Sequence, residues 1–191
     1  FIVLTLLTKN SQIKLKNINL NPSRTGIISI LKMMGAKIIL LNKKKYKGEL
    51  IGDIIVKSNK NLKGINCPAE LNSSAIDEML LLFLVSAVSK GISIYKGLEE
   101  LNKKESRRLE LGIKILKMIG IKVKKISNHG IKIYGNPKIK LKKKYLIKSF
   151  LKDHRIYMLC TIAGLSLGGE WLIKDPDSIK SSFPTFNKLI K

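Results

Sequence analysis

The chain has 191 residues, 45% of them hydrophobic, so it is long enough to bury one sizeable core. Its 37 Lys and Arg residues against 13 Asp and Glu give a net charge of +24, which raises the question of nucleic-acid binding. The lysines are spread along the whole sequence and only 6% of the residues are aromatic. We therefore interpret the charge mainly as solvated surface, and nucleic acid is not the expected partner.

The two cysteines argue against a metal site. Cys67 and Cys160 lie far apart, and neither has a partner at metal-ligand spacing, so no metal is expected. A disulfide stays open on spacing alone, but two cysteines in a lysine-rich chain are more typical of a reducing, cytoplasmic compartment.

No membrane association is expected either. The longest apolar run, residues 79–88, is too short to cross a bilayer. No basic segment precedes the first apolar run, as one would in a signal peptide.

The chain opens with an apolar helical run, "FIVLTLLTKN", followed by a strand pattern within residues 11–20. A helix normally begins after a polar start signal, and this one has none. We therefore expect the sequence to begin partway through a larger protein.

Two later segments repeat one another, and each predicts a helix followed by a strand. They are "SRTGIISILKMMGAKIIL" from Ser23 and "SRRLELGIKILKMIGIKVKK" from Ser106. Gly35 and Gly120 are predicted to end the two helices. A further strand is predicted after each segment, at 49–58 and 129–137.

The opening segment also has two later counterparts. Residues 79–88 and the run that follows Asp153 each predict an apolar helix, a polar or glycine break and a short strand.

These patterns give the order helix, strand, helix, strand, strand, and this order recurs along the chain. The first copy is truncated at its N-terminal end and the third at its C-terminal end. Such alternation predicts an α/β (α+β) fold with parallel crossovers. The period is too long for an ordinary solenoid, and no Pro-, Gly- or Ser-rich linker divides the chain. We expect residues 1–191 to form one domain of about three related units.

Arginines stand at several predicted helix starts: Arg24, Arg107, Arg108 and Arg155. The positive end of a helix prefers acids, so these choices oppose local stability. Helix N-termini and arginines both donate hydrogen bonds to anions, and together they favour a phosphate or carboxylate site.

Acids lie beside these arginines. Ser74 and Asp77 loosely fit a capping box, and Asp153 fits a plain N-cap. Alternatively, an acid such as Asp77 or Glu105 could move a proton during a reaction.

Five motifs occur in one order along the chain: "NPSRTG" at 21–26, "IDE" at 76–78, "LEELNKKES" leading to Arg108, "DHR" at 153–155 and "SFP" at 182–184. Together they resemble the second half of the enolpyruvylshikimate-phosphate (EPSP) synthase family, and its glyphosate-tolerant bacterial branch more than the other. The resemblance covers essentially the whole chain.

The resemblance implies a reaction and a fold. The family transfers the enolpyruvyl group of phosphoenolpyruvate to the 5-hydroxyl of shikimate 3-phosphate, releases phosphate and needs no cofactor. It belongs to the shikimate pathway of aromatic amino-acid biosynthesis. Its fold has two domains, each of three βαβαββ units, with the substrates in the cleft between them.

The resemblance also implies site residues. Asp77 would contact the shikimate hydroxyl and accept its proton, and Glu105 would be the second catalytic acid. The other implied roles are Lys104 on shikimate 3-phosphate, Arg108 and Arg155 on phosphoenolpyruvate, and Asp153 and His154 in support.

The chain departs from the family pattern at Arg107, where an aspartate is usual, and this change is expected to loosen Glu105 or Arg108. Two further departures are Leu80 in place of proline and Tyr157 in place of a small residue. Members of the family are about twice as long, so we expect a C-terminal fragment that is inactive without its N-terminal half. The complete enzyme is expected to be a monomer.

Three alternatives stay open. One is the related transferase that acts on UDP-N-acetylglucosamine, which shares the fold. The second is a basic nucleic-acid-binding domain, and the third is a truncated paralogue that folds without catalysing.

Overall fold

The computed structural model describes residues 1–190. Its α-helices are α1 (Ile2–Leu7), α2 (Gly26–Met33), α3 (Asn72–Ala75), α4 (Met79–Val88), α5 (Arg108–Met118), α6 (His154–Leu167) and α7 (Phe186–Leu189). Its strands are β1 (Gln12–Asn19), β2 (Lys37–Tyr46), β3 (Glu49–Lys57), β4 (Ile92–Tyr95), β5 (Lys122–Ser127), β6 (Gly130–Tyr134), β7 (Leu141–Ile147) and β8 (Gly168–Ile173). Short 3₁₀ helices are η1 (Pro22–Arg24), η2 (Ala69–Leu71), η3 (Ile76–Glu78), η4 (Glu99–Lys103) and η5 (Pro176–Ile179).

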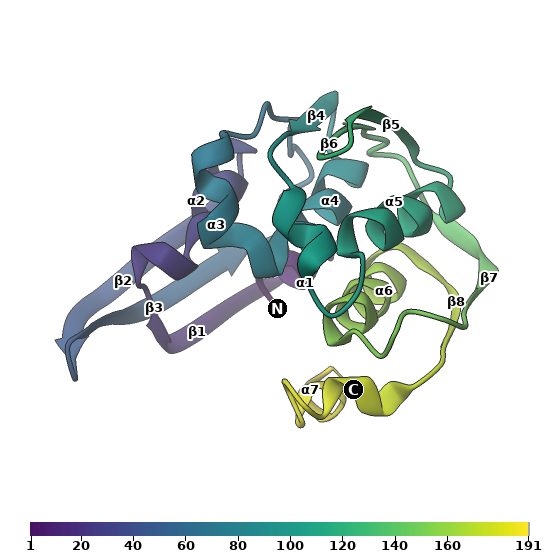
Figure 1. Ribbon diagram of the computed structural model, residues 1–191. Coiled ribbons are helices and arrows are strands. Elements are labelled where there is room, and N and C mark those ends of the chain that lie inside the picture. Colours follow the sequence, from purple (N-terminus) through teal and green to yellow (C-terminus); the bar gives the residue numbers. More distant parts are fainter. Residues whose placement is uncertain (191) are drawn as a thin grey trace.

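Three small sheets lie on the outside of the molecule, and the longer helices pack between them (Figure 1). Two of the sheets have the strand orders β1-β3-β2 and β4-β6-β5, and the third pairs β7 with β8. The mixture of helix and strand confirms the predicted α/β (α+β) class, while the number of complete repeat units stays a prediction.

The strand directions refine the expected parallel crossovers. In the first sheet, β3 pairs antiparallel with both β1 and β2. The crossover through α2 therefore joins two strands that run in one direction but have β3 between them. In the third sheet, β7 and β8 are direct parallel neighbours joined by α6.

Two extended segments were missed by the sequence patterns. Residues 62–67 run parallel to β4, with hydrogen bonds from Lys90 N to Leu62 O over 2.8 Å and from Ile94 N to Ile65 O over 2.7 Å. Strand β7 was missed because its sequence, "LKKKYLI", holds three lysines in a row and lacks apolar alternation. The segment 62–67, helix α4 and strand β4 thus repeat the arrangement of β7, α6 and β8.

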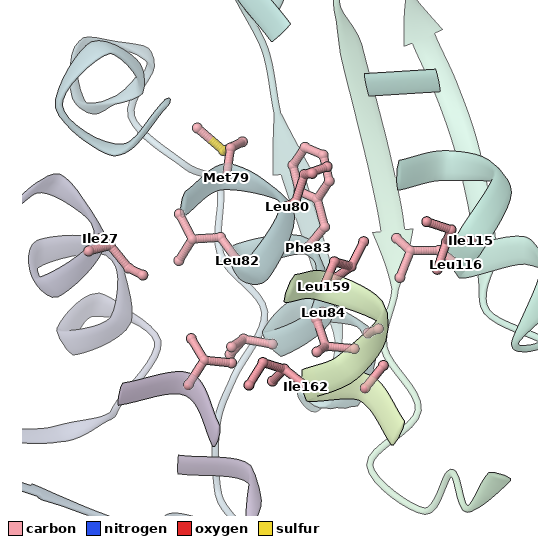
Figure 2. Close-up of a cluster of buried hydrophobic side chains, with 14 of the residues drawn as sticks. Ile27, Met79, Leu80, Leu82, Phe83, Leu84, Ile115, Leu116, Leu159 and Ile162 are labelled. Carbon is pink, nitrogen blue, oxygen red and sulfur yellow. The ribbon is translucent and has the colours of Figure 1, made fainter. Parts of the chain in front are cut away.

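Helix α4 forms the centre of the core. Leu82, Phe83 and Leu84 are fully buried, and Figure 2 shows side chains from α2, α5 and α6 around them. A helix that is apolar on all sides must be covered on all sides, which explains why it lies in the middle of the domain.

Helical turns η2, α3, η3 and α4 follow one another without a break from Ala69 to Val88. By length and composition alone this segment is long and apolar enough to cross a membrane, unlike the shorter run considered in the sequence. More than half of that window is buried inside the fold. Its apolar character is accounted for by the core that it forms.

The predicted glycine caps are confirmed. Gly35 has a φ of +92°, and Ala36 N donates to Leu31 O over 2.9 Å. Gly120 has a φ of +86°, and Ile121 N donates to Leu116 O over 2.9 Å. These 6→1 hydrogen bonds are those of a Schellman motif, which favours glycine because the backbone is left-handed there.

Both cysteines of the described chain are buried and free. Burial raises the pKa of Cys160 to about 12. Burial also raises the pKa of Cys67, with a smaller effect from the charge of Glu70, to about 11.

Candidate active site

Four segments that precede or begin helices bring charged side chains to one place. Arg24 ends η1 before α2, and Asp77 and Glu78 lie in η3 before α4. The starts of α5 and α6 supply the others, which are Glu105, Arg108, Asp153 and Arg155. We call these seven residues the charged cluster. Helix N-termini donate to anions, so this placement suits negative ligands.

Arg108 is the most buried arginine of the cluster, with 2% of its surface exposed. Its Nε donates to Asp153 Oδ2 over 2.9 Å, and its Nη2 donates to Glu105. Its Nη1 lies 3.7 Å from Asp77 Oδ1. A buried guanidinium is tolerated only where carboxylates meet its donors, so the first turn of α5 can hold an arginine here.

Asp153 serves two purposes. It caps α6, because its Oδ1 accepts from Arg155 N over 2.9 Å, which confirms the predicted N-cap. Its Oδ2 accepts from Arg108 and, over 2.7 Å, from Ser106 Oγ. Burial would raise the pKa of Asp153, but the hydrogen bonds and charge of Arg108 outweigh burial and hold the pKa below its usual value.

Asp77 is the point where the three arginines converge. Arg24 Nη1 lies 3.4 Å and Arg155 Nη2 lies 3.5 Å from Asp77 Oδ2, while Arg108 approaches the other carboxylate oxygen. Asp77 makes no side-chain cap for α4, and Ser74 Oγ instead donates to Leu71 O. The capping-box interpretation of Asp77 is therefore wrong, and its 27% exposure leaves it open to a ligand.

Glu78 is a member of the cluster that the sequence interpretation missed. Its Oε1 accepts from Arg155 Nη1 over 3.2 Å. Burial is the main cause that raises the pKa of Glu78, and the charge of Asp77 adds to it against the opposing charge of Arg155. The available signal was its position beside Asp77 in the "IDE" motif.

Lys104 and His154 lie beside the cluster in the sequence, but no side-chain hydrogen bond or ion pair joins them to it among the described residues. Lys104 is exposed and borders a hollow of about 440 Å³ together with Asn72 and Glu100. His154 is half-buried, and burial, followed by the positive charge of Arg155, lowers its pKa. His154 is therefore neutral near pH 7.

Arg107 points away from the cluster. Its Nη2 lies 2.8 Å from Glu110 Oε1, and its side chain is 69% exposed. Arg108 keeps its contacts with Glu105 and Asp153 in the presence of Arg107. The structure therefore gives no sign of the loosening expected at this position.

The arrangement can bind anions and transfer protons. Three guanidinium groups and the N-terminus of α6 face carboxylates that can act as acids or bases. In the described part of the chain, no three His, Cys, Asp or Glu side chains are placed to hold a metal ion. A separate hollow of about 750 Å³ lies at the other ends of the helices, beside Val88 and Leu167, far from this chemistry.

Comparison with known proteins points to one family. Residues 1–190 match the profile of the family described as EPSP synthase (3-phosphoshikimate 1-carboxyvinyltransferase). Curated enzymes of that name from Thermodesulfovibrio yellowstonii and Ruthia magnifica are 38% and 40% identical over 191 and 189 residues, which is 100% and 99% of this chain. The chain spans 43% and 42% of their lengths.

Solved structures agree with this assignment. An EPSP synthase from Acinetobacter baumannii has a TM-score of 0.90 and 34% identity over 98% of this chain and 43% of its own. The enolpyruvyl transferase NikO from Streptomyces tendae has a TM-score of 0.67 at 11% identity, which shows a shared fold alone. The matches do not favour the UDP-sugar or nucleic-acid alternatives. The chain therefore belongs to the EPSP synthase family.

Proposed function

We propose that this chain forms one side of the active site of an enzyme that makes 5-enolpyruvylshikimate 3-phosphate. The enzyme would transfer the enolpyruvyl group of phosphoenolpyruvate to the 5-hydroxyl of shikimate 3-phosphate and release phosphate. Family membership supports the reaction class. The observation that carries the proposal is the convergence of Arg24, Arg108 and Arg155 on Asp77.

The arginines suit the anionic substrate. Phosphoenolpyruvate carries a phosphate and a carboxylate, and guanidinium groups bind both in a bidentate manner. We assign Arg108 and Arg155 to this substrate. Arg108 is held by Asp153 and Glu105, so it would meet the substrate without first paying the entropy of being ordered.

The carboxylates suit the proton transfers. The 5-hydroxyl of shikimate 3-phosphate must lose a proton as it attacks, and we assign Asp77 as the acceptor because it is open to solvent and close to the arginines. Glu105, with its side chain 54% exposed, is assigned as the second acid. Lys104 lies just before Glu105 on an exposed turn and is assigned to the shikimate phosphate.

The relatives are more than twice as long as this chain, so we propose that an N-terminal half completes the site and that the complete enzyme works as a monomer. Positioning two substrates and excluding water supplies on the order of 7–11 kcal/mol in such reactions. One side of a cleft cannot close over the substrates. The chain alone is therefore expected to bind anions weakly and not to turn over.

Phosphate release from phosphoenolpyruvate and shikimate 3-phosphate tests the proposal. We expect none from the chain alone and turnover after the N-terminal part of the enzyme is supplied, either from its own gene or from the T. yellowstonii relative. Asp77→Asn should then lower kcat by at least about 100-fold. Asp177→Asn is the matched control, because the Asp177 side chain is 76% exposed and, among the described residues, forms an ion pair with Lys180 alone. Robust turnover by the chain alone would refute the half-site interpretation, and an active Asp77→Asn enzyme would refute the assigned base.

A further inference from the structure

The charged cluster holds one more carboxylate than guanidinium groups. Its cations are Arg24, Arg108 and Arg155, and its acids are Asp77, Glu78, Glu105 and Asp153, all joined by the contacts described above. With every group ionised, the cluster carries a net charge of −1. A substrate that brings a phosphate and a carboxylate therefore enters a site whose positive groups are already engaged by carboxylates.

The four acids differ in how firmly they are held. Asp153 is 1% exposed and fixed by three donors. Asp77 faces three guanidinium groups, and Glu105 is paired with the fixed guanidinium of Arg108. Among the described residues, Glu78 has one side-chain partner, Arg155, which lies 77 residues away in the sequence. Glu105 also has one partner, but its Arg108 is only 3% exposed, whereas Arg155 is 23% exposed. Glu78 is thus the acid that an entering anion can replace on an accessible arginine with the loss of one contact.

We propose that Glu78 is the resident counter-ion of Arg155, that an anionic group of the substrate replaces it there, and that Glu78 then takes up a proton from solvent. The inference rests on the proposed function, because it concerns the anion site assigned to Arg155. The proton passes from solvent to a carboxylate oxygen of Glu78, which becomes neutral, and no other bond changes. The empty site would thereby keep Arg155 ordered and paired.

The surroundings of Glu78 favour this exchange. The charged groups that face it are Arg155 from α6, Arg24 from η1 and its neighbour Asp77. Burial already disfavours the ionised form of Glu78, and its pKa is raised despite the two arginines. A dianion bound to Arg155 would add a like charge and would cancel the arginine charge, so both changes raise the pKa of Glu78 further.

Two effects of Glu78 on anion binding oppose each other. Its charge repels a dianion on the same guanidinium, and near a protein surface such repulsion amounts to more than tenfold in affinity. Its hydrogen bond orders the Arg155 side chain, which favours binding by about two- to tenfold. Repulsion is the larger effect, so Glu78→Gln, which removes the charge but keeps an acceptor oxygen, should bind anions more tightly.

Sulfate is a suitable probe, because it stays a dianion between about pH 5 and pH 8, whereas phosphate titrates in that range. We would titrate sulfate into the 191-residue chain by calorimetry at about pH 7.5, in buffers with different heats of ionisation. Glu78→Gln should bind sulfate about tenfold or more tightly than the wild type. The wild type should take up protons on binding, up to about one per sulfate, and the variant should not. Glu170→Gln is the matched control, because the Glu170 side chain is 69% exposed and its one ion pair within residues 1–190 is with Lys144 on the third sheet.

His154 and Asp77 are other groups near Arg155 that could take up a proton. The pKa of His154 is lowered in part by that arginine, and Asp77 Oδ2 lies 3.5 Å from Arg155 Nη2. The variants His154→Gln and Asp77→Asn separate these sources. Uptake that survives Glu78→Gln and vanishes in either of the other two variants would overturn the inference. Direct ¹³C NMR titration of the Glu78 carboxyl in the wild type needs no variant, and sulfate should shift its pKa upward.

The outcomes also separate this inference from the proposed function. Equal sulfate affinity and equal proton uptake in the wild type and Glu78→Gln would overturn the inference and leave the anion site intact. If neither protein binds sulfate in the tens-of-millimolar range, the anion site assigned to Arg155 on this chain is refuted, and the inference falls with it.

Discussion

Arg108 Nε donates to Asp153 Oδ2 over 2.9 Å, and the two side chains are only 3% and 0% exposed. This contact joins the first residue of α5 to the N-cap of α6. The helix dipole opposes an arginine at the start of α5, and the buried carboxylate at the start of α6 compensates for this.

Removing the charge of Asp153 should destabilise the domain. Asp153→Asn keeps a good N-cap for α6 but leaves the buried Arg108 with its weaker partners. We expect a loss of about 3 kcal/mol in the free energy of unfolding near pH 7, measured by urea denaturation. A loss no larger than that of the exposed control Asp177→Asn would show that Arg108 does not depend on this contact.

The pair Arg108–Asp153 also predicts that the free energy of unfolding depends on pH. The folded pKa of Asp153 lies below its usual value, so its contribution to stability is present above the unfolded pKa, about 3.9, and is lost as the pH falls through the folded pKa. The stability difference between the wild type and Asp153→Asn should therefore be full at neutral pH and shrink below about pH 4. A difference that is constant with pH would contradict this origin.

Glu78 should give a pH dependence of stability with the opposite sign. Its folded pKa is raised, so the stability it contributes is fully present below the unfolded pKa, about 4.3, and is lost as the pH rises through the folded pKa. Glu78→Gln should therefore have a higher melting temperature than the wild type near neutral pH, and nearly the same melting temperature near pH 4. Thermal unfolding followed by circular dichroism at both pH values checks this, and a less stable variant at neutral pH would contradict it.

Arg107 should be dispensable. It is exposed and, in the part of the chain that the structure describes, pairs with Glu110 alone; exposed pairs contribute little to stability. Arg107→Asp, which restores the residue usual in the family, should change the free energy of unfolding by no more than about 0.5 kcal/mol. In the completed enzyme it should leave kcat for phosphate release within about twofold. A gain of 10-fold or more would show that Arg107 disturbs the site through a route other than Arg108.

The extended segment 62–67 can be tested at Gly64. A Cβ built there would lie 2.3 Å from the carbonyl oxygen of Ile92, which is backbone and cannot move aside cheaply. Gly64→Ala should cost about 3 kcal/mol, measured by urea denaturation. Gly48→Ala is the control. Gly48 has open space around it, so the substitution should cost only the strain of placing alanine at a left-handed φ of +83°, about 1 kcal/mol. Equal losses in the two variants would show that 62–67 does not pack against β4.

The sequence by itself determined the local structure. Apolar periodicity located α2, α4, α5 and α6. The glycines that end "LKMMG" and "LKMIG" determined where two of those helices end, because helix propensity and left-handed caps depend on neighbouring residues. The sequence motifs also pointed to Asp77, Glu105, Arg108 and Arg155, and the structure brings all four together. Their catalytic roles stay predictions.

The tertiary structure decided which charges meet. Arg108 and Asp153 are 45 residues apart, and Arg155 and Glu78 are 77 apart, so no local pattern links them. The strand at 62–67 likewise depends on hydrogen bonds to β4, and β7 depends on its pairing with β8. Such contacts form only when packing around α4 brings distant helix starts to one end of the domain. There, burial raises the pKa of Glu78, whereas the hydrogen bonds and charge of Arg108 outweigh burial and lower the pKa of Asp153.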